Sequence, residues 1–302
     1  MRETEKTQTD PREGTVLKGV GSFYTVRDAE GNRYTLRCMK KVRRARLSPL
    51  PGDQVLFYPG EGEEHGWLEE ILPRKTVCLR PPVANVSRLI LVLAPMPEAD
   101  LLLADRQIAR AYGQGMEALI AVNKSELDPD MADRLRAAYA GAGIPVFAVS
   151  AKEKTGLEPL REAMKEALCC LTGQSGVGKS TLLNALLDLE LETGDLSRKI
   201  ERGKNTTRHT ELIEKDGLRV MDTAGFSLLE AEKALPPEEL RSRYPEFVPL
   251  EGQCRFRECL HDREPGCAVT AAVAAGRIDP GRVERYRLLL AEAREEWRDR
   301  YD

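Results

Sequence analysis

The chain has 302 residues, of which 41% are hydrophobic and 31% are charged, and its formal net charge is −3. This length allows two or three domains, each with its own core, and so small a net charge does not by itself indicate a nucleic-acid-binding protein. The first ten residues are polar, and the longest apolar stretch, at 89–96, is too short to span a bilayer. We therefore expect a cytoplasmic protein with no membrane partner.

Short segments of alternating hydrophobicity, separated by turns at 30–32 and 51–53, fill residues 11–75. This spacing predicts about five strands and a small all-β barrel of the oligonucleotide-binding (OB) type, in a first domain at 1–75. Seven Lys or Arg and no acid lie between Arg33 and Arg46. The run is suited to tracking RNA phosphates, but a solvated strand edge and loop explains it equally well when it is taken alone.

The pattern changes after residue 75. The apolar run at 86–94 is typical of a central parallel strand, and segments with helix and strand periodicity alternate after it. This alternation predicts an α/β domain with a mostly parallel sheet at 76–245. The remaining residues, 246–302, form a third predicted unit that holds a cysteine cluster and a charged helix beginning near Pro280.

A phosphate-binding loop is predicted in the segment CLTGQSGVGKSTLLNALL at 170–187, which contains the pattern G-x-x-x-x-G-K-S between a predicted strand and a predicted helix. The glycines allow backbone N–H groups to point at phosphates, and the helix N-terminus adds a favourable field. Lys179 is expected to reach the β- and γ-phosphates, and Ser180 to bind Mg²⁺. The predicted nucleotide-binding residues of this loop are Gly173, Gln174, Ser175, Gly176, Val177, Gly178, Lys179, Ser180 and Thr181.

Two further loops indicate which base the site binds. Asn123, Lys124 and Glu126 are similar to the N-K-x-D motif, whose carboxylate accepts two N–H donors that guanine has and adenine lacks. Here the acid is Glu, one methylene longer than Asp. The segment Ser150-Ala151-Lys152 follows the next predicted strand, where guanine-binding proteins contact O6 through a backbone N–H. Either loop alone could be an ordinary surface loop, but together they favour guanine.

Two candidate switch segments follow the phosphate loop. Thr206 and Thr207 precede a predicted strand, and Asp222-Thr223-Ala224-Gly225 is similar to the D-x-x-G loop. We expect Asp222 to hold Mg²⁺ through water, the Gly225 N–H to sense the γ-phosphate, and Thr207 to complete the Mg²⁺ shell.

The residue after the D-x-x-G loop is Phe226, where many GTPases carry a glutamine that orients the attacking water. Phenylalanine cannot orient water, so intrinsic hydrolysis is expected to be slow, with the missing group supplied by a partner or by another residue. His209 is a candidate for that residue, and a structural role in the approach to the strand is its alternative.

A metal site is predicted near the C-terminus, where Cys254, Cys259, His261 and Cys267 lie within fourteen residues. Three thiolates and one imidazole suit a structural, tetrahedral Zn²⁺. A reduced and buried cysteine cluster is the alternative, and the odd total of seven cysteines argues against a disulfide framework. Three arginines interleave with the ligands: Arg255, Arg257 and Arg263.

The order of the motifs differs from that of an ordinary GTPase, because both base loops precede the phosphate loop. A circular permutation keeps the same packed sheet and moves only the chain ends. With a barrel before it and a zinc knuckle after it, the chain resembles the ribosome-small-subunit-dependent GTPases, the RsgA family. The segments that carry the resemblance include GVGSFYTV, PLPGDQV, RPPVANV, GQSGVGKSTLLN, RGKNTTRHTEL, DTAGF and CRFRECLHDREPGCAV.

The resemblance implies a circularly permuted P-loop GTPase domain between an OB-type barrel and a small zinc-binding α domain. It implies an enzyme that uses GTP and Mg²⁺, holds Zn²⁺, and hydrolyses GTP to GDP on the small ribosomal subunit late in the maturation of that subunit. The barrel and the zinc domain would contact ribosomal RNA, other assembly factors could be further partners, and a monomer is expected.

Two other functions are compatible with some of these residues. One is an ATP-dependent enzyme that uses only the phosphate loop. The other is a nucleotide-gated RNA-binding scaffold with little hydrolysis. Two features depart from the family pattern: Glu126 stands in place of Asp, and the join between the predicted helix at 156–167 and the strand before the phosphate loop contains no glycine. The short join is expected to strain or displace that strand.

Overall fold

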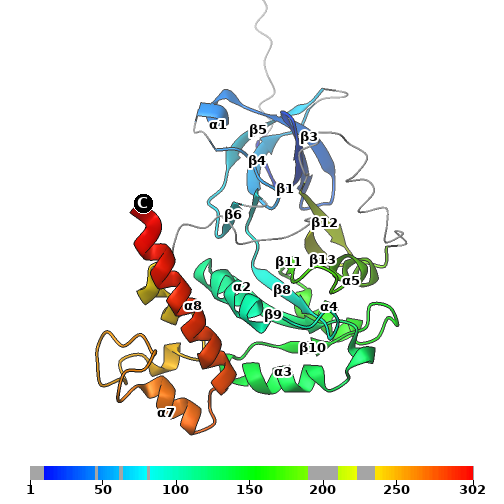
Figure 1. Ribbon diagram of the computed structural model, residues 1–302. Coiled ribbons are helices and arrows are strands. Elements are labelled where there is room, and N and C mark those ends of the chain that lie inside the picture. The colour runs from blue at the N-terminus through cyan, green and yellow to red at the C-terminus, as the bar shows by residue number, and fades with distance from the viewer. Residues whose placement is uncertain are drawn as a thin grey trace, which may run out of the picture.

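The structure is a computed structural model that describes residues 10–44, 47–60, 64–79, 82–189, 210–222 and 235–301. Figure 1 shows a barrel, a sheet covered by helices, and a C-terminal helical unit beside that sheet. In the described part of the chain, no helix combines the length and the apolar composition that crossing a membrane requires.

Five strands close into the predicted OB-type barrel, in the order β1-β2-β3-β5-β4. Alternate residues of the strands point inward, and six of them are fully buried: Val16, Val26, Leu36, Val55, Phe57 and Leu68. This alternation is what the sequence pattern predicts. The strands are β1 (Arg12–Val20), β2 (Phe23–Asp28), β3 (Arg33–Cys38), β4 (Gln54–Tyr58) and β5 (Gly66–Ile71).

The basic run contains a short helix that its sequence pattern does not predict. Arg33 and Arg37 lie on β3, and helix α1 (Lys40–Arg44) follows directly. Val42 is buried in the barrel core, so the barrel interior holds this turn of helix in place. Within its described residues, 33–44, the run is therefore partly strand and partly helix.

The predicted α/β domain contains a six-stranded sheet in the order β10-β9-β8-β11-β13-β12. Its first five strands are parallel, and β12 pairs antiparallel with β13 at the edge. A small two-stranded sheet, β6 (Val77–Leu79) with β7 (Pro82–Ala84), joins the barrel to it. The six strands are β8 (Arg88–Leu93), β9 (Glu117–Val122), β10 (Val146–Ala148), β11 (Leu168–Thr172), β12 (Glu211–Lys215) and β13 (Leu218–Asp222).

Helices cover both faces of this sheet, because alternate residues of each strand face opposite sides. On β8, Leu89, Leu91 and Leu93 share a core with α2 and α3, whereas Ile90 and Val92 share a core with α4 and α5. The helices are α2 (Leu101–Gly113), α3 (Met131–Tyr139), α4 (Leu157–Met164) and α5 (Lys179–Leu186), with the short turns η1 (Ser125–Leu127) and η2 (Ala140–Ala142).

The glycine-free join between α4 and β11 does not displace the strand. Glu166 adopts the left-handed conformation, with φ 60°, that a glycine would take at less cost. Strand β11 nevertheless pairs in parallel with β8 on one side and β13 on the other. The expected displacement is therefore wrong, because the cost of the short join is confined to the backbone of one residue.

Salt bridges hold the barrel against the edge of the sheet. Lys18 on β1 pairs with Glu211 at 3.0 Å, and Arg27 Nη2 on β2 donates to Glu214 Oε1 at 2.8 Å. Both acids lie on β12. The barrel thus covers the edge strand, a strand that would otherwise be open to pairing with another chain.

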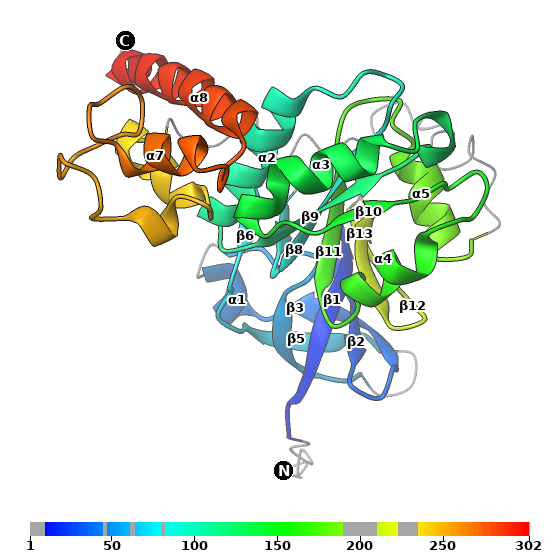
Figure 2. The ribbon, with the colours of Figure 1, turned by 90° about the horizontal axis from the view of Figure 1, so that it is seen from below.

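The C-terminal unit packs against α2, as Figure 2 shows for α8. Its core contains the aromatic residues Tyr244, Phe247 and Tyr286 together with Cys259 and Cys267. The unit includes η3 (Pro237–Arg243), which lies before the predicted start at 246, because Leu240 and Tyr244 pack in its core. Its other elements are η4 (Val248–Leu250), α7 (Ala268–Ala274), α8 (Pro280–Arg298) and η5 (Asp299–Tyr301).

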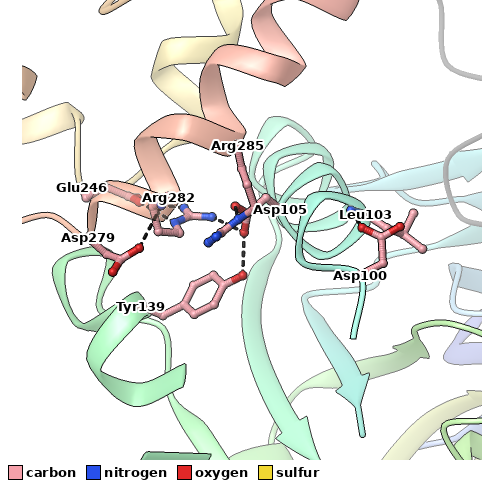
Figure 3. A network of polar contacts seen from close by, with 8 residues as sticks. All are labelled: Asp100, Leu103, Asp105, Tyr139, Glu246, Asp279, Arg282 and Arg285. Atoms are coloured by element: carbon pink, nitrogen blue, oxygen red, sulfur yellow. Dashed lines mark hydrogen bonds and ion pairs between the residues drawn. The ribbon is translucent and has the colours of Figure 1, made fainter. Parts of the chain in front are cut away.

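A buried ion-pair network joins this unit to the sheet domain (Figure 3). Arg282 of α8, only 1% exposed, donates to Asp105 Oδ1 of α2 at 2.5 Å and to Glu246 Oε1 at 2.8 Å. Arg285 donates to the other oxygen of Asp105 at 2.5 Å, and the Tyr139 hydroxyl of α3 donates to Oδ1 at 2.6 Å. The two arginines and two carboxylates have no net charge together, and their mutual attraction offsets part of the free-energy cost of removing each charge from water.

We predict that Asp105→Ala lowers the free energy of unfolding by about 3–5 kcal/mol, because it leaves buried arginine charge without its partner. Urea unfolding followed by the emission of Trp297 in α8 measures this in a Trp67→Phe background, which contains no other tryptophan.

The matched control is Asp133→Ala, which breaks an exposed pair with Arg136, where the side chains are 74% and 48% exposed. It should cost about 1 kcal/mol or less. Equal losses in the two variants would contradict the assigned role of the buried network.

Candidate nucleotide site and metal centre

Four loops meet at one edge of the sheet, because the carboxyl ends of parallel strands lie together. They follow β8, β9, β10 and β11, and they include residues 94–100, 123–126, 149–155 and 173–178. The predicted base loops and the predicted phosphate loop are thus neighbours in space, although β11 comes last of the four strands along the chain.

The side chain of Asn123 connects three of these loops. Its amide nitrogen donates to Val177 O of the phosphate loop at 2.9 Å, and its oxygen accepts from the Ala151 N–H at 3.0 Å. Asn123 is 2% exposed, so these bonds form away from water. One buried amide therefore fixes the distance between the base loops and the phosphate loop.

Lys124 adds a second connection from the same loop. It adopts the left-handed conformation with φ 58°, and its ammonium donates to Met96 O at 2.7 Å and to Gly176 O at 2.8 Å. The lysine side chain thus lies across the phosphate loop and keeps it beside the loop that follows β8.

Two glycines of the phosphate loop are required by their surroundings. A Cβ on Gly173, whose φ is 137°, would lie 2.1 Å from Val92 O, and a Cβ on Gly178, whose φ is 90°, would lie 2.5 Å from Asn123 Nδ2. Any side chain at either place would push the loop off the sheet or break the Asn123 contact. The pattern G-x-x-x-x-G-K-S has this physical basis here.

Helix α5 begins directly after Gly178, with Lys179 as its first residue and Ser180 exposed in its first turn. The Lys179 ammonium donates to Gly173 O at 2.8 Å and to Gln174 O at 2.7 Å. Burial lowers the pKa of Lys179. A partly buried ammonium at a helix N-terminus, beside exposed backbone, is an arrangement that favours a bound anion.

The second base loop lies next to Glu126. A hydrogen bond from Ser150 is the largest cause that lowers the pKa of Glu126, which keeps this side chain a carboxylate. Glu126 Oε2 is buried and, among the described residues, has no hydrogen-bond partner. Ser150 exchanges two backbone hydrogen bonds with Thr155, which closes the loop around Lys152. The sequence-predicted base residues are therefore brought together.

Several predicted switch residues lie outside the described residues: Thr206, Thr207, His209, Gly225 and Phe226. Asp222 is described as the last residue of β13, and its neighbour Met221 pairs with Cys170 of β11. Strand β13 therefore ends beside the strand that leads into the phosphate loop, which is where a D-x-x-G loop has to begin.

Sequence reasoning missed the loop between β8 and α2. The Asp100 N–H donates to Gln174 Oε1 at 3.0 Å, and the Asp100 carboxylate caps α2 by accepting from Leu103 N at 2.9 Å. An Asp before an apolar helical segment is a recognisable N-cap signal. Its contact with the phosphate loop, in contrast, depends on the strand order.

The predicted metal ligands converge in the C-terminal unit. The ligand atoms of Cys254, Cys259, His261 and Cys267 all lie within 4.8 Å of one another. His261 Nδ1 is 3.6, 3.6 and 3.4 Å from the three sulfurs, in chain order. A tetrahedral zinc ion with ordinary bond lengths has nitrogen–sulfur edges of about 3.6 Å.

The donor set therefore fits zinc. Four protein ligands leave no open position, which is typical of a structural site. Burial lowers the pKa of His261 and so favours the neutral imidazole that binds a metal. The cluster packs on Phe247, whose ring centroid is 5.4 Å from that of His261, so a bound ion would stabilise the core of the unit.

Comparison with known proteins gives matches along most of the chain. A family model described as RsgA GTPase matches residues 71–232, and one described as RsgA N-terminal domain matches residues 13–68. A curated relative from Ruminiclostridium cellulolyticum, named "Small ribosomal subunit biogenesis GTPase RsgA", is 43% identical over 279 residues, covering 90% of this chain and 91% of the relative. A relative of the same name from Moorella thermoacetica is also 43% identical, over 284 residues and 93% and 97% of the two chains.

Solved structures show the same architecture. The crystal structure of YjeQ from Thermotoga maritima superposes with a TM-score of 0.80 at 34% identity, covering 94% of this chain and 98% of that chain. The structure of YloQ, described as a circularly permuted GTPase, also gives a TM-score of 0.80, at 28% identity, with 97% and 98% covered. The chain shares this permuted order of strands.

We predict that Cys259→Ser reduces bound zinc from about one ion per chain to a small fraction, since the thiolate supplies one of four tetrahedral bonds. Metal analysis of the dialysed protein gives the content, and thermal unfolding should show that the C-terminal unit melts at a lower temperature.

Cys169→Ser is the matched control, because Cys169 is equally buried but lies in the sheet core. It should keep its zinc. Full zinc content in Cys259→Ser would mean that this sulfur is not a ligand.

Proposed function

The chain belongs to the RsgA GTPase family, and on this premise we propose that it hydrolyses GTP to GDP and phosphate on the small ribosomal subunit during late maturation of that subunit. The nucleotide would bind where the four loops meet. The observation that carries this proposal is the Asn123 side chain, which bonds both the phosphate loop and the Ser150-Ala151-Lys152 loop. This function would place the protein in the cytoplasm, where it would act as a monomer.

Guanine would be recognised by the two base loops. The Glu126 carboxylate would accept the N–H donors of the base, and its buried oxygen without a partner among the described residues supports this role. Asn123 and Lys124 would frame the base, and the backbone at Ala151 and Lys152 would face O6. Adenine offers no pair of donors to a carboxylate, so we expect GTP to be preferred over ATP.

The phosphates would be held by the loop at 173–181. Its N–H groups and the start of α5 favour negative charge, and Lys179 would leave Gly173 O and Gln174 O for the β- and γ-phosphates. Both carbonyl contacts are hydrogen bonds of ordinary length, so this exchange needs only a rotation of the side chain. Mg²⁺ would neutralise phosphate charge when bound, with Ser180, Thr207 and Asp222 as the residues that hold it.

Phe226 stands directly after the D-x-x-G loop, where many GTPases carry the glutamine that orients the attacking water. The group that orients the water is therefore proposed to come from another residue of the chain or from a partner. The Gly225 N–H would sense the γ-phosphate, and His209 is the candidate within the chain. A group supplied by the ribosomal subunit would make hydrolysis fast only in the complex, so GTP would be hydrolysed mainly when the protein is bound to the subunit.

Binding to the subunit would use the barrel and the metal-bearing unit, both through ribosomal RNA, with other assembly factors as further partners. Arg255, Arg257 and Arg263 lie between the metal ligands in sequence. A structural ion would hold these arginines on a rigid knuckle, which reduces the entropy lost when they contact phosphates.

We predict that isolated small ribosomal subunits stimulate GTP turnover by the purified protein by at least about tenfold, which corresponds to about 1.4 kcal/mol in the barrier. Phosphate release is measured with and without subunits, and ATP is the control nucleotide. Large ribosomal subunits at the same concentration test whether the effect is specific.

Other outcomes would favour the other functions. Tight guanine binding without stimulation would favour a nucleotide-gated scaffold, and equal turnover of ATP would favour an enzyme that reads only the phosphates.

We predict that Glu126→Ala weakens GDP binding by about 10- to 100-fold, because hydrogen bonds to a charged group contribute about 1.5–3 kcal/mol. The weak affinity for ADP should hardly change, since adenine does not use the carboxylate. Competition with a fluorescent GDP analogue measures both affinities.

Glu153→Ala is the control, because Glu153 is exposed in the neighbouring loop. It should bind GDP as the parent does. A Glu126→Ala protein with unchanged preference for GDP would show that another group recognises the base.

A further inference from the structure

A row of aromatic and basic side chains crosses the outer face of the barrel. Phe23 on β2 pairs in register with Arg37 on β3, and Arg37 pairs with Trp67 on β5. Side chains that are paired in register on adjacent strands lie on the same face of a sheet. The sequence neighbours Leu36 and Leu68 are fully buried in the barrel, so the row faces outward. We call these three residues the Phe23–Arg37–Trp67 row.

The row is exposed and partly preordered. Trp67 is 48% exposed, although a tryptophan on a barrel of this size could be buried. The Arg37 guanidinium lies 4.4 Å from the centroid of the Phe23 ring, and the His65 ring packs edge-on against the same Phe23 ring, at 4.7 Å between centroids. A cation–π contact of this kind restrains the Arg37 side chain before any ligand binds and so lowers the entropy it loses on binding.

Positive charge lies on both sides of the row along β3. Arg33 lies on the same face of β3, and α1, which packs against β3 and β5, begins with Lys40 and Lys41. The nearby carboxylate of Glu70 on β5 is paired with Lys41 at 3.7 Å. Flat aromatic surface next to lysines and arginines is the combination that binds a nucleic-acid strand, with bases on the rings and phosphates at the charges.

We propose that the Phe23–Arg37–Trp67 row is a stacking platform for unpaired bases of RNA. The proposal rests on the proposed ribosomal function for the choice of RNA, and it adds which part of an RNA the barrel binds. Strands 2 and 3 form the binding face of OB barrels in general.

The chemistry of the row selects unpaired bases over a duplex. Stacking on an aromatic ring needs a free π-face, and bases inside a helix already stack on one another. An RNA duplex presents only phosphates, sugars and base edges, which Arg33 and Lys40 could contact but Trp67 could not stack upon. A single-stranded loop or end offers both kinds of contact.

The test uses Trp297→Phe, in which Trp67 is the sole tryptophan. The fluorescence emission of Trp67 is followed while a ten-nucleotide single-stranded RNA is added. A separate titration uses the duplex that this strand forms with its complement. We expect saturable quenching by the single strand and no more than a small change with the duplex. Affinity for the labelled single strand should fall by about 5- to 150-fold in full-length Trp67→Ala, the range observed for loss of one base–aromatic stack.

Arg33→Ala is the matched control on the same barrel face. It should weaken binding of single strand and duplex by the same factor, because it removes only charge. Thermal unfolding of each variant verifies that the barrel is folded. Unchanged single-strand affinity in Trp67→Ala, or equal quenching by the duplex, would overturn the proposal.

Intact small subunits provide a further arm. If they shift the Trp67 emission while their extracted RNA does not, the row contacts a protein and the stacking proposal is wrong. GTP turnover measured in the same preparations separates the two proposals. If stacking is lost but the subunits still stimulate GTP turnover, only the stacking proposal is wrong. If the RNA binds but the subunits do not stimulate turnover, only the proposed GTPase function is wrong.

Discussion

One buried amide determines the geometry of the nucleotide site. The Asn123 amide nitrogen donates to Val177 O, and its oxygen accepts from the Ala151 N–H. Neither buried polar group therefore lacks a hydrogen-bond partner. Its position at the end of β9, beside the chain that leaves β8 for α2, lets one side chain reach loops that are far apart in sequence. The close approach also explains why position 178 has to be glycine, since any Cβ there would occupy the place of the amide.

Helix α2 connects this site to the metal-bearing unit. Its N-cap residue, Asp100, bonds the phosphate-loop residue Gln174, and one turn further on Asp105 receives the two arginines of α8 (Figure 3). A single rigid helix therefore contacts the phosphate loop at its start and the C-terminal unit along its side. This second contact is made by buried charges. Moving α8 away from α2 would leave arginine and carboxylate groups buried without their partners, which is costly.

Much of the fold and site followed from local patterns. The alternation in the barrel strands, the continuous apolar run of β8 and the G-x-x-x-x-G-K-S loop each depend on residues close in sequence, and each was confirmed as an element of the structure. Helix α1 was missed, because its five residues give too short a pattern and its place depends on Val42 entering the barrel core. The strand displacement expected at the short join was wrong, because pairing on both sides of β11 outweighs the cost of one left-handed residue, Glu166.

The sequence by itself predicted the chemistry of this protein: a loop suited to phosphates, a carboxylate proposed for guanine, and four side chains whose ligand atoms the structure brings together in a set that fits zinc. These properties depend on residue type and short spacing, which folding does not alter. Only the tertiary structure decided which groups meet across long separations, such as Asn123 with Val177, Asp105 with Arg282, and Phe23 with Arg37 and Trp67. Such contacts follow from strand order and register, and these are set by the packing of whole layers, which no local spacing records.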